Sequence, residues 1–324
     1  MTIKQTPKIL SIIFLLIFAF TIPLWLGSYW TQTVTMGMVI GITAMSFILL
    51  TGYCGVVSFA QMSFYAMAAY VFALTIKDYH WPTYISIPLA ILGAVILSAI
   101  FGAIAIRSNG IFFLMMTLAL SQLFSGLMLD WQSVTHGYSG FTGVVRPSIF
   151  GFSLMKTNPR YYTTLVALII CYLILLRIVS SPFGLSLQGM QDNTRRMKAL
   201  GFNTDLRRFV AILISGFFAG IGGILGIFSS ASVSPATGDL SANVMVLMAA
   251  LIGGIWRLEG GILGGIIVIF LINFTKQFTS RYWLIIGILF ILIMIFLPNG
   301  LLGINFSKIP SRIKSGFKKN KQSA

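Results

Sequence analysis

Apolar runs of about 20 residues recur along nearly the whole chain, and they constrain its fold more than any other feature. A helix needs about 20 residues to cross the hydrocarbon core of a bilayer. Strands of a membrane barrel would appear instead as shorter segments with alternating polarity. With 57% hydrophobic and 9% charged residues, the sequence predicts an all-α membrane protein, a polytopic helical bundle.

We expect about ten transmembrane helices in a single domain that covers residues 1–324. The first run resembles a signal peptide, but residues 27–29 offer no small-x-small cleavage pattern, so a retained first span is expected. Several spans are joined by glycine-rich segments, where helices could be broken or re-entrant. The expected spans are 9–27, 33–51, 57–76, 84–106, 111–129, 161–180, 209–230, 241–256, 260–277 and 282–302.

The placement of lysine and arginine predicts the orientation, because loops rich in these residues tend to stay in the cytoplasm. With both termini inside, sixteen of the 22 basic residues fall on the cytoplasmic side and six outside. The segment 181–208 is then a cytoplasmic loop, and 131–160 is the longest external loop. The basic tail 305–324 is expected to contact anionic lipid. A bacterial inner-membrane location follows from this orientation together with the resemblance given below.

The sequence offers few residues that could carry out proton transfer, metal binding or catalysis within the membrane. All six acidic residues lie in loops or at span ends, which argues against a proton relay, although sodium coupling through carbonyl groups stays possible. The cysteines and histidines form no metal or disulfide pattern, so we expect no catalytic residue, no metal and no cofactor. The net charge of +16 is spread between apolar spans, unlike a nucleic-acid surface. A membrane-embedded enzyme would need a nucleophile or an acid/base pair at depth.

The polar segment 181–208 is predicted to form two short helices. Ser181 can cap the first helix, with Pro182 at its first position, and Gly201 can end the second in a left-handed conformation. The break is expected near Asp192 and Asn193.

An apolar stripe follows this segment, since Phe183, Leu187, Met190 and Met197 share one helical face. Two partners are possible for it. The stripe could lie on the lipid surface. Alternatively, it could dock an ATPase, because the chain has no GxxxxGK[ST] phosphate loop and any ATP hydrolysis must occur in another subunit.

Two glycine-rich joints, Gly52–Tyr70 and Gly253–Gly265, lie in different halves of the chain. Close helix packing through small residues is one interpretation, and broken helices beside a substrate pathway is the other. In the second case the pathway would be lined by uncharged polar groups. The candidates are Ser58, Gln61 and Ser63, and, on one face of the fifth span, Thr117, Ser121 and Gln122.

The external segment 131–160 contains HGYSGFTG, with glycines at 137, 140 and 143. Its length, glycines and aromatic residues are typical of a compact cap over the mouth of a pathway. An ordinary surface loop is the alternative.

An ordered set of motifs resembles the permease family of the branched-chain amino acid ABC importers, particularly the LivM-like subunit. The resemblance covers roughly residues 35–303. It lies in GYCGVVSFAQMSFYAMAAYV, THGYSG, SPFG, QDN, KALGFNT, SGFFAGIGGILG and LPNGLLG. The chain departs from the family pattern at Ala60, Ala66, Ala68 and His136, where glycines are frequent, and at Arg257 and Glu259, where the joint is usually neutral.

The resemblance implies a permease that moves a small neutral amino acid, most simply a branched-chain one, by alternating access. It implies a second, LivH-like permease, ABC ATPase subunits and a periplasmic substrate-binding protein as partners, within the lipid bilayer. It also makes segment 181–208 the ATPase coupling element. The helical stripe favours Leu187, Met190 and Met197 as its contact residues, while the family match favours Asp192, Asn193 and Gly201. Urea or short amides as substrate, or a secondary carrier, are the alternatives.

Overall fold

A computed structural model describes residues 20–303 apart from 24, 109, 150–151, 280 and 297–299. This part of the chain is almost entirely helical, as predicted, and its few strands have two residues each. Most of the expected first span, the basic tail and part of the LPNGLLG motif lie outside the described residues. The α-helices are α2 (Ser28–Ile48), α3 (Gln61–Lys77), α4 (Thr83–Ala105), α5 (Ile111–Asp130), α6 (Gln132–Thr135), α7 (Thr157–Ser180), α8 (Pro182–Ala199), α9 (Thr204–Ser230), α10 (Leu240–Gly253), α11 (Leu258–Lys276) and α12 (Tyr282–Phe296).

Six helical segments of the described chain are long and apolar enough to cross a membrane. They are α2 continued through the π-helical turn η1 (Leu49–Tyr53), α4, α5, α7, α9 and α11. Helix α10 and the part of α12 up to Ile293 are shorter apolar helices. The predicted span limits agree to within about five residues. The larger differences are at helix starts, since α3 begins four residues after the predicted start, whereas α2, α7 and α9 begin four or five residues before it.

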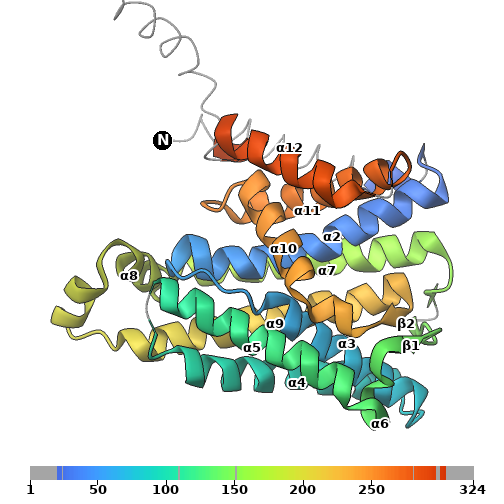
Figure 1. Cartoon of the computed structure of the whole chain (residues 1–324), viewed down its shortest axis with the longest axis horizontal. Helices are drawn as coiled ribbons and strands as arrows, with labels where there is room; N and C mark the ends of the chain where they lie inside the picture. Colours follow the sequence, from blue (N-terminus) through green and yellow to red (C-terminus); the bar gives the residue numbers. More distant parts are fainter. Residues whose placement is uncertain are drawn as a thin grey trace, which may run out of the picture.

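The bundle has two distinct ends. Figure 1 shows α8 at one end, here called the α8 end, and α6 with the strands β1 (Phe141–Thr142) and β2 (Ser148–Ile149) at the other, the cap end. Segments 181–208 and 131–160, predicted to lie on opposite sides of the membrane, therefore lie at opposite ends of the bundle.

The segment 131–160 is ordered through short elements, as the compact-cap interpretation requires. Helix α6 is followed by the 3-10 turn η2 (Gly137–Ser139), by β1, and by a hairpin of β2 with β3 (Phe152–Ser153). Strand β1 pairs antiparallel with β4 (Ser232–Val233), which follows α9. Because this pairing joins distant parts of the chain, the segment is attached to the bundle rather than free. Whether it covers a pathway stays a prediction.

Close helix packing explains much of the glycine content. Helices α2 and α11 meet along Gly37 and Gly41 on one side and Gly261 and Gly265 on the other. A methyl group on Gly265 would lie 2.5 Å from the backbone nitrogen of Gly41. Spacing of four residues between small side chains lets two backbones approach in this way. Helix α2 is accordingly the most enclosed candidate span, with 89% of its apolar window buried.

Helix α8 confirms the predicted break. The Ser181 hydroxyl accepts a hydrogen bond from the backbone nitrogen of Gly184 (3.4 Å), with Pro182 in the first turn. Asn193 leaves the helical conformation (φ −161°, ψ 97°), and its Oδ1 accepts from the nitrogen of Arg196 (2.9 Å), which starts the second helical part. Gly201 follows the helix with a φ of +84°.

Candidate functional site: a polar junction between two broken helices

The first broken helix begins inside the bundle. Helix α2 and η1 run to the α8 end, residues 54–60 turn back without helical structure, and α3 begins at Gln61. The Ser46 hydroxyl lies 3.0 Å from Gln61 Oε1. Ser46 precedes the end of η1 by seven residues, or about 10 Å of helix. Helix α3 therefore starts well within the bundle and runs to the cap end, where Lys77 Nζ donates to the Thr142 carbonyl (3.0 Å).

The second broken helix has the opposite direction. Helix α9 runs toward the cap end, residues 231–239 return through β4 and the 3-10 turn η3 (Pro235–Gly238), and α10 begins at Leu240. Asn243, in its first turn, donates from Nδ2 to Ser121 Oγ (3.1 Å). Ser121 precedes the end of α5 by nine residues, or about 13 Å. Helix α10 thus starts at depth and runs toward the α8 end.

The starts of α3 and α10 meet directly. The backbone nitrogen of Met62 donates to Asn243 Oδ1 (3.0 Å), and the Ser63 hydroxyl lies 2.8 Å from the Ser121 hydroxyl. Helix N-termini carry a partial positive charge, and transporters built from broken helices direct such ends at their substrate. We call this group the polar junction; it consists of Ser46, Gln61, Ser63, Ser121, Ser215 and Asn243, each at most 3% exposed.

The junction also ties α3 to α2 and α9. Gln61 Nε2 donates to Ser215 Oγ (2.9 Å), and Ser215 Oγ lies 3.0 Å from the Ser46 carbonyl oxygen. These groups satisfy one another, as buried polar groups must. All are uncharged, so their bonds can be exchanged for bonds to water or to a solute without exposing an unpaired charge.

The six predicted pathway residues have different positions. Gln61, Ser63 and Ser121 belong to the polar junction. Ser58 caps the turn before α3 by accepting from the nitrogen of Ala60 (3.3 Å), and Thr117 accepts from the nitrogen of Phe59 (3.1 Å).

Gln122 lies on the cap side of the junction, where its Nε2 donates to Asp239 Oδ1 (3.3 Å). Sequence reasoning did not single out Ser46, Ser215, Asn243 and Asp239. Asn243 could have been noticed as a side-chain amide within the expected span 241–256.

The second predicted joint connects two helices by close packing and is not a broken helix. Residues 254–257 form a tight turn between α10 and α11. The two helices then pack closely, because a methyl group on Gly264 of α11 would lie 1.7 Å from the Ala249 carbonyl oxygen of α10. This supports the packing interpretation for that stretch. The broken helix of this half begins after 231–239 instead. Glu259, which departs from the usually neutral joint of the family pattern, has a partner within the chain. Its Oε1 accepts a hydrogen bond from the Tyr172 hydroxyl (2.7 Å).

The apolar stripe of α8 packs on the chain itself. Leu187, Met190 and Met197 are 0%, 2% and 9% exposed. The stripe therefore already has a partner, which the sequence could not reveal. Asp192, Asn193 and Gly201 are exposed at the α8 end.

The kink of α8 touches the first broken helix. Gly55, in the segment 54–60, has a φ of +74°, and a methyl group there would lie 3.0 Å from Gln191 Cγ and 3.2 Å from Gln191 Cα. Gln191 precedes Asp192 and the break at Asn193. A continuous path of contacts thus leads from the exposed kink of α8 through residues 55–60 to the polar junction.

The start of α9 supports this path. The Arg207 guanidinium donates to the Ser186 hydroxyl of α8. The buried Arg208 guanidinium donates to the Ser108 carbonyl oxygen (3.2 Å) and to the Cys54 sulfur. Arginine thereby joins α8, α9 and the segment before α3 at the α8 end.

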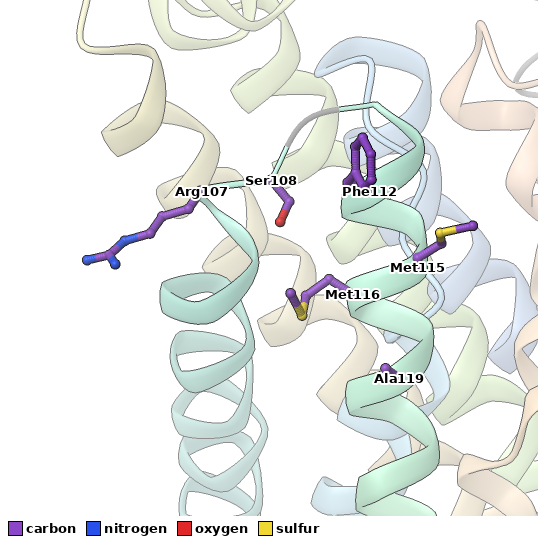
Figure 2. Close-up of a pocket in the computed structure, with 6 residues that line it drawn as sticks. All are labelled: Arg107, Ser108, Phe112, Met115, Met116 and Ala119. Atoms are coloured by element: carbon purple, nitrogen blue, oxygen red, sulfur yellow. The ribbon is translucent and has the colours of Figure 1, made fainter.

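An apolar cavity of about 560 Å³ lies between the end of α4 and the first turns of α5. Figure 2 shows Phe112, Met115 and Met116 on α5, with the Arg107 side chain extending away from that helix. The polar residues of the junction do not line this cavity. Within the described residues no group of three His, Cys, Asp or Glu side chains could hold a metal ion, and both Cys54 and Cys171 are buried free thiols.

Long apolar helices, a buried uncharged polar site and two oppositely directed broken helices define the chain as a multi-pass membrane permease component. The profile described as "Branched-chain amino acid transport system / permease component" matches residues 29–297. The chain belongs to this family of ABC transporter permeases.

Relatives extend over most of the chain but differ in substrate. The high-affinity branched-chain amino acid transport system permease protein LivM of Escherichia coli (strain K12) is 24% identical over 99% of this chain and 80% of its own length. The ribose import permease protein RbsC of Haemophilus influenzae is 23% identical over 67% of this chain and 69% of its own. The guanosine ABC transporter permease protein NupQ of Bacillus subtilis is 27% identical over 32% of each chain. No solved structure matches the chain.

Proposed function

We propose that this chain is the transmembrane permease subunit of an ATP-driven importer in a bacterial inner membrane. It moves branched-chain or other small neutral amino acids by alternating access, as one domain of about ten membrane helices with both termini in the cytoplasm. The meeting of two oppositely directed helix starts at the polar junction is the observation that carries this proposal.

The polar junction supports alternating access through exchange of hydrogen bonds. When α3 and α10 move apart, the Met62–Asn243 and Ser63–Ser121 bonds open, and groups of a solute or its water take their place. Because every member is uncharged, the solute can leave as readily as it enters. Ribose and guanosine, named for two relatives, share with a zwitterionic amino acid a net charge near zero. The junction therefore suits neutral polar solutes, and the extent of the LivM match favours an amino acid among them.

Coupling to ATP hydrolysis rests on α8. Leu187, Met190 and Met197 hold α8 against the bundle, while the exposed Asp192, Asn193 and Gly201 contact separate ATPase subunits. A shift of the α8 kink then reaches the polar junction through Gln191 and Gly55. A second, LivH-like permease completes the membrane pathway, and a periplasmic binding protein delivers the solute at the cap end.

Purification from native membranes followed by reconstitution tests the proposal. We expect an ABC ATPase and a binding protein to co-purify with the tagged chain. Liposomes that contain the complex should then take up leucine only with ATP and the binding protein. Leucine uptake without any ATPase would identify a secondary carrier, and uptake restricted to urea, short amides or ribose would replace the proposed substrate.

A single substitution tests the docking surface. Replacing Asp192 with lysine reverses an exposed charge at the α8 kink without touching the core. We expect the variant to insert normally and to lose the co-purified ATPase. Asp130→Lys makes the same change at the cap end and should keep the ATPase. Retention of the ATPase by both variants would contradict the docking assignment.

A further inference from the structure

A second cavity, of about 480 Å³, lies on the cap side of the polar junction. Its wall includes Gln122 and Ser125 of α5 and Tyr138 of η2. Ala236 of η3 and Asp239, the residue directly before α10, complete this wall. The cavity adjoins the junction, because Asn243 Nδ2 donates to the Asp239 carbonyl oxygen (3.2 Å). Its volume is in the range of small-molecule sites.

The Asp239 carboxylate gives this cavity a negative charge. Its Oδ1 accepts from the nitrogen of Leu240 (2.7 Å) and from Gln122 Nε2 (3.3 Å), and both donors are neutral. Asp239 forms no ion pair within the described chain, whereas the Asp205 carboxylate lies 3.6 Å from Lys198 Nζ. The start of α10 carries a partial positive charge, which favours an acidic side chain at this position. In a chain of net charge +16, an acidic group that faces a cavity without a basic neighbour is unusual.

Ser125 provides an independent sign of a missing polar partner. This residue lines the same cavity and is 6% exposed, and its Oγ has no hydrogen-bond partner. Buried hydroxyl groups nearly always have one. A ligand that donates or accepts hydrogen bonds would supply the missing partner after a small rotation of the Ser125 side chain.

We propose that this cavity is a subsite for the ammonium group of the transported solute. The Asp239 carboxylate receives the ammonium in a charge-assisted hydrogen bond, and Ser125 contributes a further one. The inference rests on the proposed function and refines it, because a solute without an ammonium group gains nothing from Asp239. The negative charge selects the amino end of a zwitterion before it reaches the uncharged junction.

The charge of the cavity can be measured without transport. The exposed Ala236 is replaced with cysteine in the full chain, in a background of Cys54→Ser and Cys171→Ser, and reconstituted in liposomes. Methanethiosulfonate reagents carrying a trimethylammonium or a sulfonate group then label Cys from the cap side. We expect Asp239→Asn to lower the ratio of cationic to anionic labelling rates by roughly tenfold.

The Asp239→Asn substitution removes the negative charge while it keeps the helix cap. Asparagine caps a helix as well as aspartate and keeps the oxygen that Leu240 and Gln122 use, so the fold is preserved. Asp130→Asn removes a carboxylate from the same end of the bundle, outside the cavity, and should leave the ratio unchanged. An equal ratio in the parent and in Asp239→Asn would overturn the proposal.

Ligand protection completes the test. L-leucine should slow cationic labelling in the parent and lose this effect in Asp239→Asn, while 4-methylpentanoate, which lacks the amino group, should not protect. Equal protection by both compounds would overturn the ammonium assignment. Uptake by the complete importer is measured separately. Protection without ATP-driven amino-acid uptake would defeat the proposed function alone, and uptake without protection would defeat the subsite alone.

Discussion

At the scale of single residues, Asn243 joins the two broken helices. Its Oδ1 accepts from the nitrogen of Met62, and its Nδ2 donates to Ser121 and to the Asp239 carbonyl. One amide side chain therefore satisfies groups on α3, α5 and the start of α10. Alanine at this position would leave buried donors and acceptors without partners.

We expect Asn243→Ala to lower the free energy of unfolding by about 1–3 kcal/mol, the cost of leaving a buried polar group unpaired. The measurement is unfolding of the purified protein in detergent, followed by tryptophan fluorescence. Gln277→Ala is the control, because the Gln277 amide bonds the Tyr29 hydroxyl at the exposed surface. Equal losses in the two variants would show that the junction bonds contribute little.

At the scale of elements, the contact of α8 with residues 54–60 links the exposed kink to the polar junction. Gly55→Ala places a methyl group 3.0–3.2 Å from Gln191 and adds strain at a φ of +74°. We expect the complex to assemble and hydrolyse ATP while uptake falls by about tenfold or more, a coupling loss of ordinary size. ATPase activity and uptake are measured on the same liposomes.

A second glycine with a positive φ distinguishes the effect of the Gln191 contact from the effect of backbone strain. Gly143 has a φ of +68° and nothing within 4 Å of an added methyl group. Gly143→Ala should therefore show the effect of strain alone and keep uptake coupled to ATP hydrolysis. If both variants lost uptake equally, the Gln191 contact would have no special role.

Helix packing is a second property of the elements. A methyl group on Gly223 of α9 would lie 2.1 Å from the Tyr65 carbonyl oxygen of α3, where backbone cannot move aside cheaply. We expect Gly223→Ala to destabilise the fold by about 1–3 kcal/mol. Gly126→Ala on α5 meets no atom within 4 Å and should stabilise by roughly 0.5–1 kcal/mol through helix propensity. Detergent unfolding of both variants checks the difference in sign.

At the scale of the whole molecule, the two ends of the bundle predict opposite accessibility. A membrane-impermeant maleimide should label Tyr138→Cys, at a cap position 90% exposed, in intact cells with a permeable outer layer. Arg195→Cys, exposed on α8, should react only after the inner membrane is opened. The buried Cys54 and Cys171 should leave the parent protein unlabelled. Early labelling of position 195 would reverse the predicted orientation.

The sequence by itself determined where the helices lie, because apolar length and local caps act over a few residues. It also located the break at Asn193 and three members of the polar junction, Gln61, Ser63 and Ser121. Only the tertiary structure decided which polar groups meet, because the decisive hydrogen bonds join residues as far apart as Met62 and Asn243. Periodicity likewise placed Leu187, Met190 and Met197 on one face of α8 but could not show that the bundle itself covers that face. A helical stripe records which side chains lie together, whereas the surface that buries them depends on how distant helices pack.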